Sequence, residues 1–117
     1  MINALTLSRV GKFSIETVTG TDEFQCGTLG RREFDYRVEI ETLPVLDEKG
    51  FIFDNFAIQS FFDATFKNTH DVPSCEQMAI IAANGLAHAV GDACLRCSVT
   101  IDGTGFAGLT ATWEKPQ

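Results

Sequence analysis

The sequence predicts an α+β fold: a four-stranded antiparallel sheet with two helices on one face, in the order ββααββ. Two observations lead to this prediction. Apolar and polar residues alternate with a period of two toward both ends of the chain, and apolar residues recur every three or four positions in its middle. The length of 117 residues suits one domain, which we expect to cover residues 1–117.

The clearest predicted strand covers residues 33–43, where apolar and charged residues alternate. Such alternation is typical of an antiparallel strand with one buried face and one face toward solvent. The same alternation predicts strands in residues 95–101 and in residues 109–113. A weaker pattern of apolar residues suggests a first strand in residues 5–15, with an irregularity at Gly11.

The middle of the chain predicts two helices with identifiable caps. Asp54 follows a turn and an apolar run at residues 51–53, which we expect to be buried, and its carboxylate can cap a helix. The apolar stripe of this helix consists of Ile58, Phe61, Phe62 and Phe66. Ser74 and Gln77 fit a capping box for the second helix. We expect this helix to bury Met78, Ile81, Ala82, Gly85, Leu86 and Ala89, and to stop at Gly91.

The charge balance argues against some classes of partner. Asp and Glu number 16 against 9 Lys and Arg, so the net charge is −7, which disfavours binding to nucleic acid or to an anionic membrane. The sequence has no apolar run long enough to predict a membrane span. We also expect no secretory signal, and therefore a cytoplasmic protein with reduced thiols.

Cys94 and Cys97 have CxxC spacing, which often indicates a metal or redox site. They lie in a predicted strand, where residues three apart point to opposite faces. No second CxxC pair and no nearby histidine completes a zinc site. We therefore expect these residues to be structural thiols.

One stretch resembles a known family. Residues 46–50 read LDEKG, three apolar residues follow, and Asp54 precedes a predicted helix. This resembles the central segment of the 6-pyruvoyltetrahydropterin synthases and 6-carboxytetrahydropterin synthases, which typically reads LDEKGMVVDFGDLK. The resemblance covers about residues 12–113 and implies the T-fold, or tunnelling fold. It also implies a homo-oligomer joined through sheet edges, which removes the two free edges of a four-stranded sheet.

The chain departs from the zinc site that this resemblance implies. The family binds zinc through a histidine on its first strand and an H-x-H pair in an HGHNY motif on its second. The corresponding positions here are Thr17, Arg32 and Phe34, while Tyr36 matches the family tyrosine. Arginine stays protonated and phenylalanine has no donor atom, so neither can ligate zinc. We expect no zinc site, and the sequence indicates no other cofactor.

Two residues are candidates for the family's proton-transfer chemistry. Cys26 lies six residues before Arg32, the offset of the catalytic cysteine in some members, and the alternative is a loop thiol without chemistry. His70 lies near the position of the family's L-D-H motif, which is absent, and the alternative is a solvated loop histidine. Without zinc, the family's phosphate-eliminating lyase reaction lacks its Lewis acid. The sequence leaves open whether the protein is an enzyme.

The second predicted helix carries the match to the family's ligand-binding motif. Residues 73–79 read PSCEQMA against P-T-x-E-N-L-A, and Glu76 falls at the glutamate that anchors the ligand. A carboxylate can accept two parallel hydrogen bonds from the amino and ring N–H groups of a pterin or similar heterocycle. The alternative is an ordinary acidic residue in a first helical turn. Asp102 is the acid nearest to the family's second contact, although it is one carbon shorter and lies in a different turn.

Three hypotheses follow from the sequence. The first is a 6-pyruvoyltetrahydropterin synthase-like protein that binds a pterin- or purine-like heterocycle at a subunit interface, with the zinc site lost. The second is a non-catalytic oligomeric scaffold or interaction protein that kept only the fold. The third is a metal-free enzyme that acts on a related bicyclic substrate through Cys26 or His70.

Overall fold

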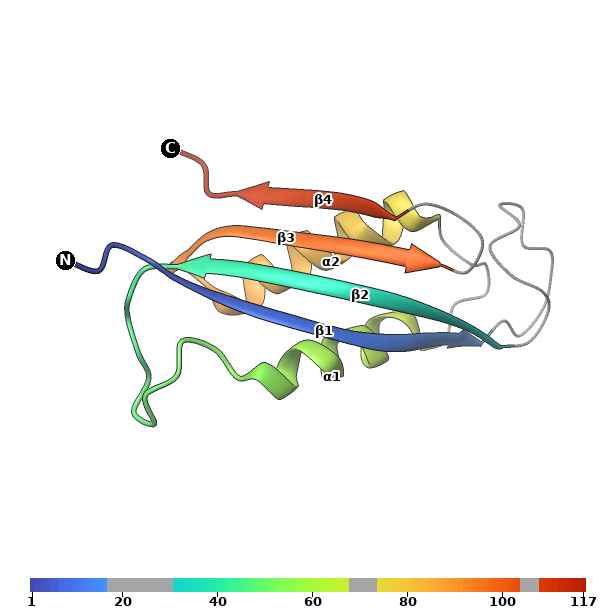
Figure 1. Cartoon of the computed structure of the whole chain (residues 1–117), viewed down its shortest axis with the longest axis horizontal. Helices are drawn as coiled ribbons and strands as arrows, with labels where there is room; N and C mark the ends of the chain where they lie inside the picture. Colours follow the sequence, from blue (N-terminus) through green and yellow to red (C-terminus); the bar gives the residue numbers. More distant parts are fainter. Residues whose placement is uncertain (17–30, 68–73, 104–107) are drawn as a thin grey trace.

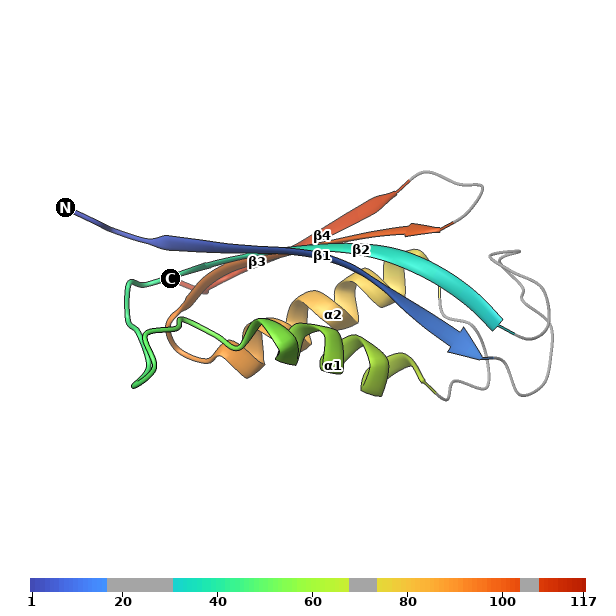
Figure 2. The same cartoon turned by 60° about the horizontal axis from the view of Figure 1, so that its bottom comes forward.

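The computed structural model describes residues 1–16, 31–67, 74–103 and 108–117. It contains β1 (Leu5–Glu16), β2 (Arg31–Thr42), α1 (Asn55–Phe66), α2 (Cys75–Val90), β3 (Cys94–Gly103) and β4 (Leu109–Glu114). The strands form one antiparallel sheet in the order β1-β2-β3-β4, and both helices cover the same face of it (Figures 1 and 2). The predicted fold with the order ββααββ is confirmed. In the ranges given above, neither helix has the length and apolar character that a membrane span requires.

The sheet buries one face and leaves the other open. On β2, Val38 and Ile40 are fully buried on the helix side, while Arg37 and Glu39 point away from it and are exposed. This is the expected consequence of a strand whose successive side chains alternate between faces. The apolar core therefore lies between the sheet and the two helices, and the open face is polar.

β1 is regular along its whole length, so the predicted irregularity at Gly11 is wrong. Its pairing with β2 continues without a shift through all 12 residues. Gly11 instead makes room for a ring: it lies opposite Tyr36, and a Cβ atom here would fall 2.5 Å from the Tyr36 hydroxyl oxygen. Glycine is required at position 11 because the Tyr36 ring packs closely against the backbone there, and not because the strand bends.

Both helices begin at their predicted caps. The Asp54 carboxylate accepts a hydrogen bond of 2.9 Å from the Phe56 N–H. Ser74 Oγ accepts from the Gln77 N–H at 3.1 Å, and Gln77 Oε1 accepts from the Ser74 N–H at 2.9 Å, which completes the capping box. α2 ends at Gly91, whose φ of 92° is left-handed backbone that glycine adopts easily.

α1 packs through its predicted stripe into an aromatic cluster. Ile58, Phe62 and Phe66 are fully buried. The Phe62 ring stacks on Tyr36 with 4.1 Å between centroids and on Phe13 with 5.1 Å. Such contacts add to the stabilisation from burial alone, so this cluster ties α1 to the first two strands.

The buried face of α2 differs in part from the prediction. Met78, Ala82 and Leu86 are buried as expected, but Ile81 is 44% exposed and Ala89 is exposed. The remaining buried positions are mostly alanines, namely Ala79, Ala83 and Ala87. Small side chains let the helix lie close to β3 and β4, which leaves the larger Ile81 at the side of the interface.

The apolar run at residues 51–53 is not buried as predicted. Phe51 is 58% exposed, and Phe53 is only partly buried against the core. The preceding turn explains this, because Asp47 Oδ1 accepts hydrogen bonds from the N–H groups of Lys49 and Phe51, at 2.8 and 2.9 Å. The chain therefore curls around this carboxylate and does not form a strand under the sheet.

Cys94 and Cys97 are buried on the same side of the sheet, which corrects the expectation that they point to opposite faces. Both are fully buried. Thr42 pairs with Cys94, and the pairing then skips Leu95, so this bulge breaks the alternation between the two cysteines. Burial raises the pKa of Cys97 to about 12, and the nearby Cys94 adds to the rise. A thiol that stays protonated is a poor nucleophile and a poor metal ligand.

Candidate functional site

One end of the sheet carries the elements on which the predicted site residues lie. Here β1 and β3 end, β2 and β4 begin, and α2 begins (Figure 1). Glu76 is in the first turn of α2, and Asp102 is near the end of β3. We call this end of the sheet, which carries Glu76 and Asp102, the polar end. Cys26 and His70 lie outside the described residues, so their roles stay predictions.

Glu76 is held in place without using its own carboxylate. The reciprocal bonds between Ser74 and Gln77 satisfy the start of α2. Cys75 and Met78 on either side are buried and fix the first turn against the core. Glu76 itself is exposed and makes no hydrogen bond or ion pair with any residue that the structure describes. A fixed helix start thus presents a carboxylate that no other described residue engages.

Asp102 lies on the other side of the sheet from α2. Its neighbour Ile101 is fully buried under the helices, so the alternation turns Asp102 to the open face, where it is exposed. There it lies directly opposite Asp35, which forms an ion pair of 3.4 Å with Lys12. Within one chain, Asp102 and Glu76 therefore share an end of the sheet but do not face one site.

The positions that correspond to the family's zinc ligands are only partly described. Phe34 is buried in the core, and its ring stacks on Phe13 with 5.5 Å between centroids. Thr17 and the side chain of Arg32 are outside the described residues. Among the residues that are described, no group of three or more His, Cys, Asp or Glu side chains is placed to hold a metal ion.

Tyr36, which matches the family tyrosine, connects β2 to β1 and α1. Its hydroxyl accepts a hydrogen bond of 3.0 Å from Arg9 Nε and donates one of 2.7 Å to Gln59 Oε1. Gln59 Nε2 then donates to the main-chain carbonyl of Lys12 at 2.8 Å. The tyrosine is thus engaged in holding α1 against β1.

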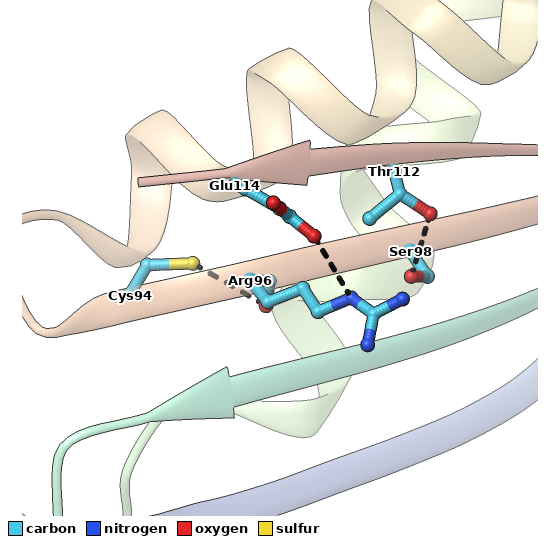
Figure 3. Close-up of polar contacts among 5 residues, drawn as sticks. All are labelled: Cys94, Arg96, Ser98, Thr112 and Glu114. Carbon is cyan, nitrogen blue, oxygen red and sulfur yellow. Dashed lines mark hydrogen bonds and ion pairs between the residues drawn. The ribbon is translucent and has the colours of Figure 1, made fainter. Parts of the chain in front are cut away.

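The open face of the sheet carries a shallow polar groove of about 220 Å³. Hydroxyl pairs across β3 and β4 line it, Ser98 with Thr112 at 3.0 Å and Thr100 with Thr110 at 2.6 Å. Figure 3 shows the first pair beside Arg96, whose Nε lies 3.9 Å from the Glu114 carboxylate. Within each pair one hydroxyl donates its proton to the other, and the second hydroxyl can donate its own proton to a further acceptor.

An apolar hollow of about 1240 Å³ opens at the opposite end, between the first half of β1 and residues 46–56. Its walls include Leu5, Leu7 and the exposed ring of Phe51. Phe56 is 75% exposed beside it, with the Arg9 guanidinium 6.0 Å from its ring centroid. We name this the apolar hollow. Sequence reasoning missed it, although the apolar run at residues 51–53 was the signal that could have revealed it.

No family model and no curated protein sequence matches the chain. Solved structures do match it. A catalytic-residue mutant of 6-pyruvoyltetrahydropterin synthase from Plasmodium vivax aligns with a TM-score of 0.63 and 9% sequence identity, over 97% of this chain and 100% of that chain. The Plasmodium falciparum enzyme gives a TM-score of 0.62 at 7% identity, with the same coverage. A further Plasmodium vivax structure of the enzyme gives 0.57 at 10% identity, again over 97% and 100% of the two chains.

The structural comparison therefore confirms the fold that the resemblance predicted. This protein has the fold of the 6-pyruvoyltetrahydropterin synthases, the T-fold, along nearly its whole length. At identities of 7 to 10% the likeness concerns the fold, and the function must be argued from the residues.

Proposed function

We propose that this protein is 6-pyruvoyltetrahydropterin synthase-like in binding as well as in fold. It binds a pterin- or purine-like heterocycle at an interface between subunits, with Glu76 as the anchoring carboxylate. The observation that carries the proposal is the placement of Glu76: it lies exposed and unpaired, among the described residues, on a helix start whose backbone is satisfied by other side chains.

The chemistry of Glu76 suits this ligand class. A pterin or guanine presents an amino group and a ring N–H side by side, and one carboxylate can accept both in parallel. Each charge-assisted hydrogen bond contributes roughly 1.5–3 kcal/mol. Because Ser74 and Gln77 hold the helix start, the Glu76 backbone is ordered before the ligand arrives, which lowers the entropic cost of binding.

A neighbouring subunit is part of this proposal because Glu76 lines neither the polar groove nor the apolar hollow that the described residues of one chain form. β1 and β4 are the two edge strands of the sheet that the structure describes, and edge pairing would satisfy backbone groups that point outward from them. We therefore propose a homo-oligomer joined through sheet edges, in which Asp102 of a neighbour is a second candidate for contact. Light scattering is expected to find an oligomer, and a stable monomer at micromolar concentration would contradict it.

The proposed site contains no zinc. Phe34 has no donor atom and is packed against Phe13 in the core. Elemental analysis of the purified protein is expected to find no stoichiometric zinc. A result of about one zinc per chain, bound near Thr17, Arg32 and Phe34, would overturn this part of the proposal.

One observation favours a second candidate function. Glu76 lines neither the polar groove nor the apolar hollow of the single chain. A scaffold that kept the fold without its ligand would also leave this residue exposed. A non-catalytic oligomeric scaffold is therefore the alternative, and ligand binding separates the two.

Thermal-shift and calorimetric titrations with neopterin and with guanine test the proposal. A ligand that binds the folded state raises the melting temperature by mass action. Glu76→Gln keeps the shape but replaces one acceptor with a donor, so affinity should fall at least about tenfold, or 1.4 kcal/mol. Glu48→Gln, an exposed glutamate in the turn at the opposite end, is the matched control and should bind normally. Equal affinities of both variants would remove Glu76 from the site, and no binding at all would favour the scaffold.

A further inference from the structure

We propose that β4 of a second copy pairs antiparallel with residues 5–9 of β1, and that Trp113 of the second copy covers the apolar hollow. This inference rests on the proposed assembly through sheet edges. It adds which part of each edge pairs, in which register, and which side chains form the contact.

The backbone N–H and C=O groups that point outward from β1 and from β4 are arranged so that the two edges can pair. The Lys12 carbonyl faces outward from β1, because it accepts from Gln59 Nε2 at 2.8 Å. On β4, the Lys115 N–H faces inward and donates to the Leu95 carbonyl on β3 at 3.0 Å. Outward and inward groups alternate along a strand. The backbone groups of Thr6 and Ser8 on β1, and of Thr110 and Thr112 on β4, therefore point outward from the sheet, and their side chains lie on the open face.

Gln59 restricts where a second strand can pair. Its side chain already occupies the outward carbonyl of Lys12, in the middle of β1. β4 has six residues and covers only half of the 12 residues of β1. Lys12 belongs to the second half of β1, whereas no described residue bonds the outward carbonyls of Thr6 and Ser8 in the first half, so β4 of the second copy pairs there.

The hydroxyl pairs of the polar groove select the register. When Thr110 of the second copy lies opposite Ser8, its Thr112 lies opposite Thr6. The rows that join Thr100 to Thr110 and Ser98 to Thr112 within one chain then continue onto Ser8 and Thr6 of its neighbour. A shift by two residues in one direction would place Thr110 against the exposed, apolar Val10. A shift in the other direction would move Trp113 off β1.

The same register brings apolar surfaces together on the helix side. Trp113 is half-buried on β4 and packs against the core of its own chain. It would lie against Leu5 of the neighbouring copy, at the wall of the apolar hollow. Leu46 and Phe51, each more than half exposed in the single chain, would lose contact with water. Exposed apolar clusters of this kind mark interaction sites.

This pairing also gives Glu76 a neighbour. Residues 11–16 of β1 continue beyond Leu109 of the second copy, toward the end where α2 of that copy begins (Figure 1). α2 packs against β3 and β4, and it begins at the end of the sheet where β4 begins (Figure 1). The unpaired half of β1 would thus form a wall beside Glu76 of the second copy, as the proposed ligand site requires.

Cysteine cross-linking tests the register. In a Cys26→Ser background, the pair Thr6→Cys with Thr112→Cys should form disulfides between copies under mild oxidation, because directly opposite residues lie about 5.5 Å apart between Cα atoms. The pair Ser8→Cys with Thr112→Cys is the control, because diagonal neighbours at about 7–8 Å are too distant. An oligomer that cross-links better through the control pair, or through neither pair, overturns the register but leaves the assembly intact. A monomer overturns the assembly as well.

Light scattering of two surface variants tests the contact at the hollow. Phe51→Ser should raise the concentration needed for assembly at least tenfold. Ile80→Ser removes a similarly exposed side chain from α2 and should assemble like the wild type. Wild-type assembly of the Phe51→Ser protein would show that the hollow is not covered. Equal weakening by both variants would also contradict the proposal. Circular dichroism checks that both variants are folded.

Discussion

The two ends of the sheet differ in what their side chains can bind. At the polar end, a well-capped helix start presents the exposed carboxylate of Glu76, which no other described residue engages. At the opposite end, the apolar hollow exposes Phe51 and Leu46 beside a free strand edge. A lone carboxylate can select a ligand through directed hydrogen bonds. Apolar surface has no such directionality and gains stability from any partner that excludes water.

In the proposed account, the polar end binds the ligand and the apolar hollow binds a second copy, so one sheet carries two different kinds of contact. Both ends rest on one apolar core, which includes the aromatic cluster around Phe62 that fixes α1 against β1 and β2. They differ in the caps that start the two helices, because Asp54 lies at the hollow and Ser74 at the polar end.

The largest effect is expected from the shared core. Phe62→Ala removes a fully buried ring that stacks on Tyr36 and Phe13, and it should lower the free energy of unfolding by about 3–5 kcal/mol. Phe56→Ala removes a ring from the same helix that is 75% exposed, and it should change the value by about 0.5 kcal/mol or less. Urea unfolding at one fixed protein concentration measures both. Similar losses in the two variants would contradict the position of the core.

A pH effect of intermediate size is expected from the buried thiol of Cys97. Its pKa rises from 9.0 to about 12 on folding, so its contribution to stability is complete below pH 9 and is lost as pH rises toward 12. The Cys97→Ala variant should therefore lose less stability than the wild type between pH 9 and 11. Unfolding free energies measured across that range check this. If the stability of the two proteins changed with pH in the same way, folding would not raise the pKa of the Cys97 thiol.

The smallest effects are expected from the two caps, and they should differ in their functional result. Ser74→Ala and Asp54→Ala should each cost about 1 kcal/mol of stability. Ser74→Ala should also weaken binding of the heterocycle, because it loosens the turn that carries Glu76. Asp54→Ala should leave that binding unchanged. Calorimetric titration measures the affinity of both variants. Equal affinities would show that the Ser74 cap does not support binding through Glu76.

Much of the fold could be predicted from local patterns, because each element carries its own signal. The alternation in β2 and the caps at Asp54 and Ser74 depend on neighbours in sequence, and the structure confirms them. The buried face of α2 was partly wrong, because packing of its alanines against the sheet decides the rotation of the helix. Periodicity within one helix does not contain that information.

The errors at the site have the same origin. The burial of residues 51–53 was wrong because hydrogen bonds to Asp47 redirect the chain, and three consecutive apolar residues do not report that turn. The orientation of Cys94 was wrong because a bulge adds one residue to β3, which only the pairing with β2 reveals. Glu76 could be selected by resemblance and cap chemistry, whereas its separation from Asp102 by the sheet required the assembled fold.

Hydrogen–deuterium exchange of the wild-type protein with and without neopterin tests the central claim most directly. The claim is that the heterocycle binds at the polar end, against Glu76, and not in the apolar hollow. We predict that saturating neopterin slows amide exchange in residues 74–79 and leaves residues 46–56 unchanged. Slower exchange in residues 46–56, with no change in residues 74–79, would contradict the account.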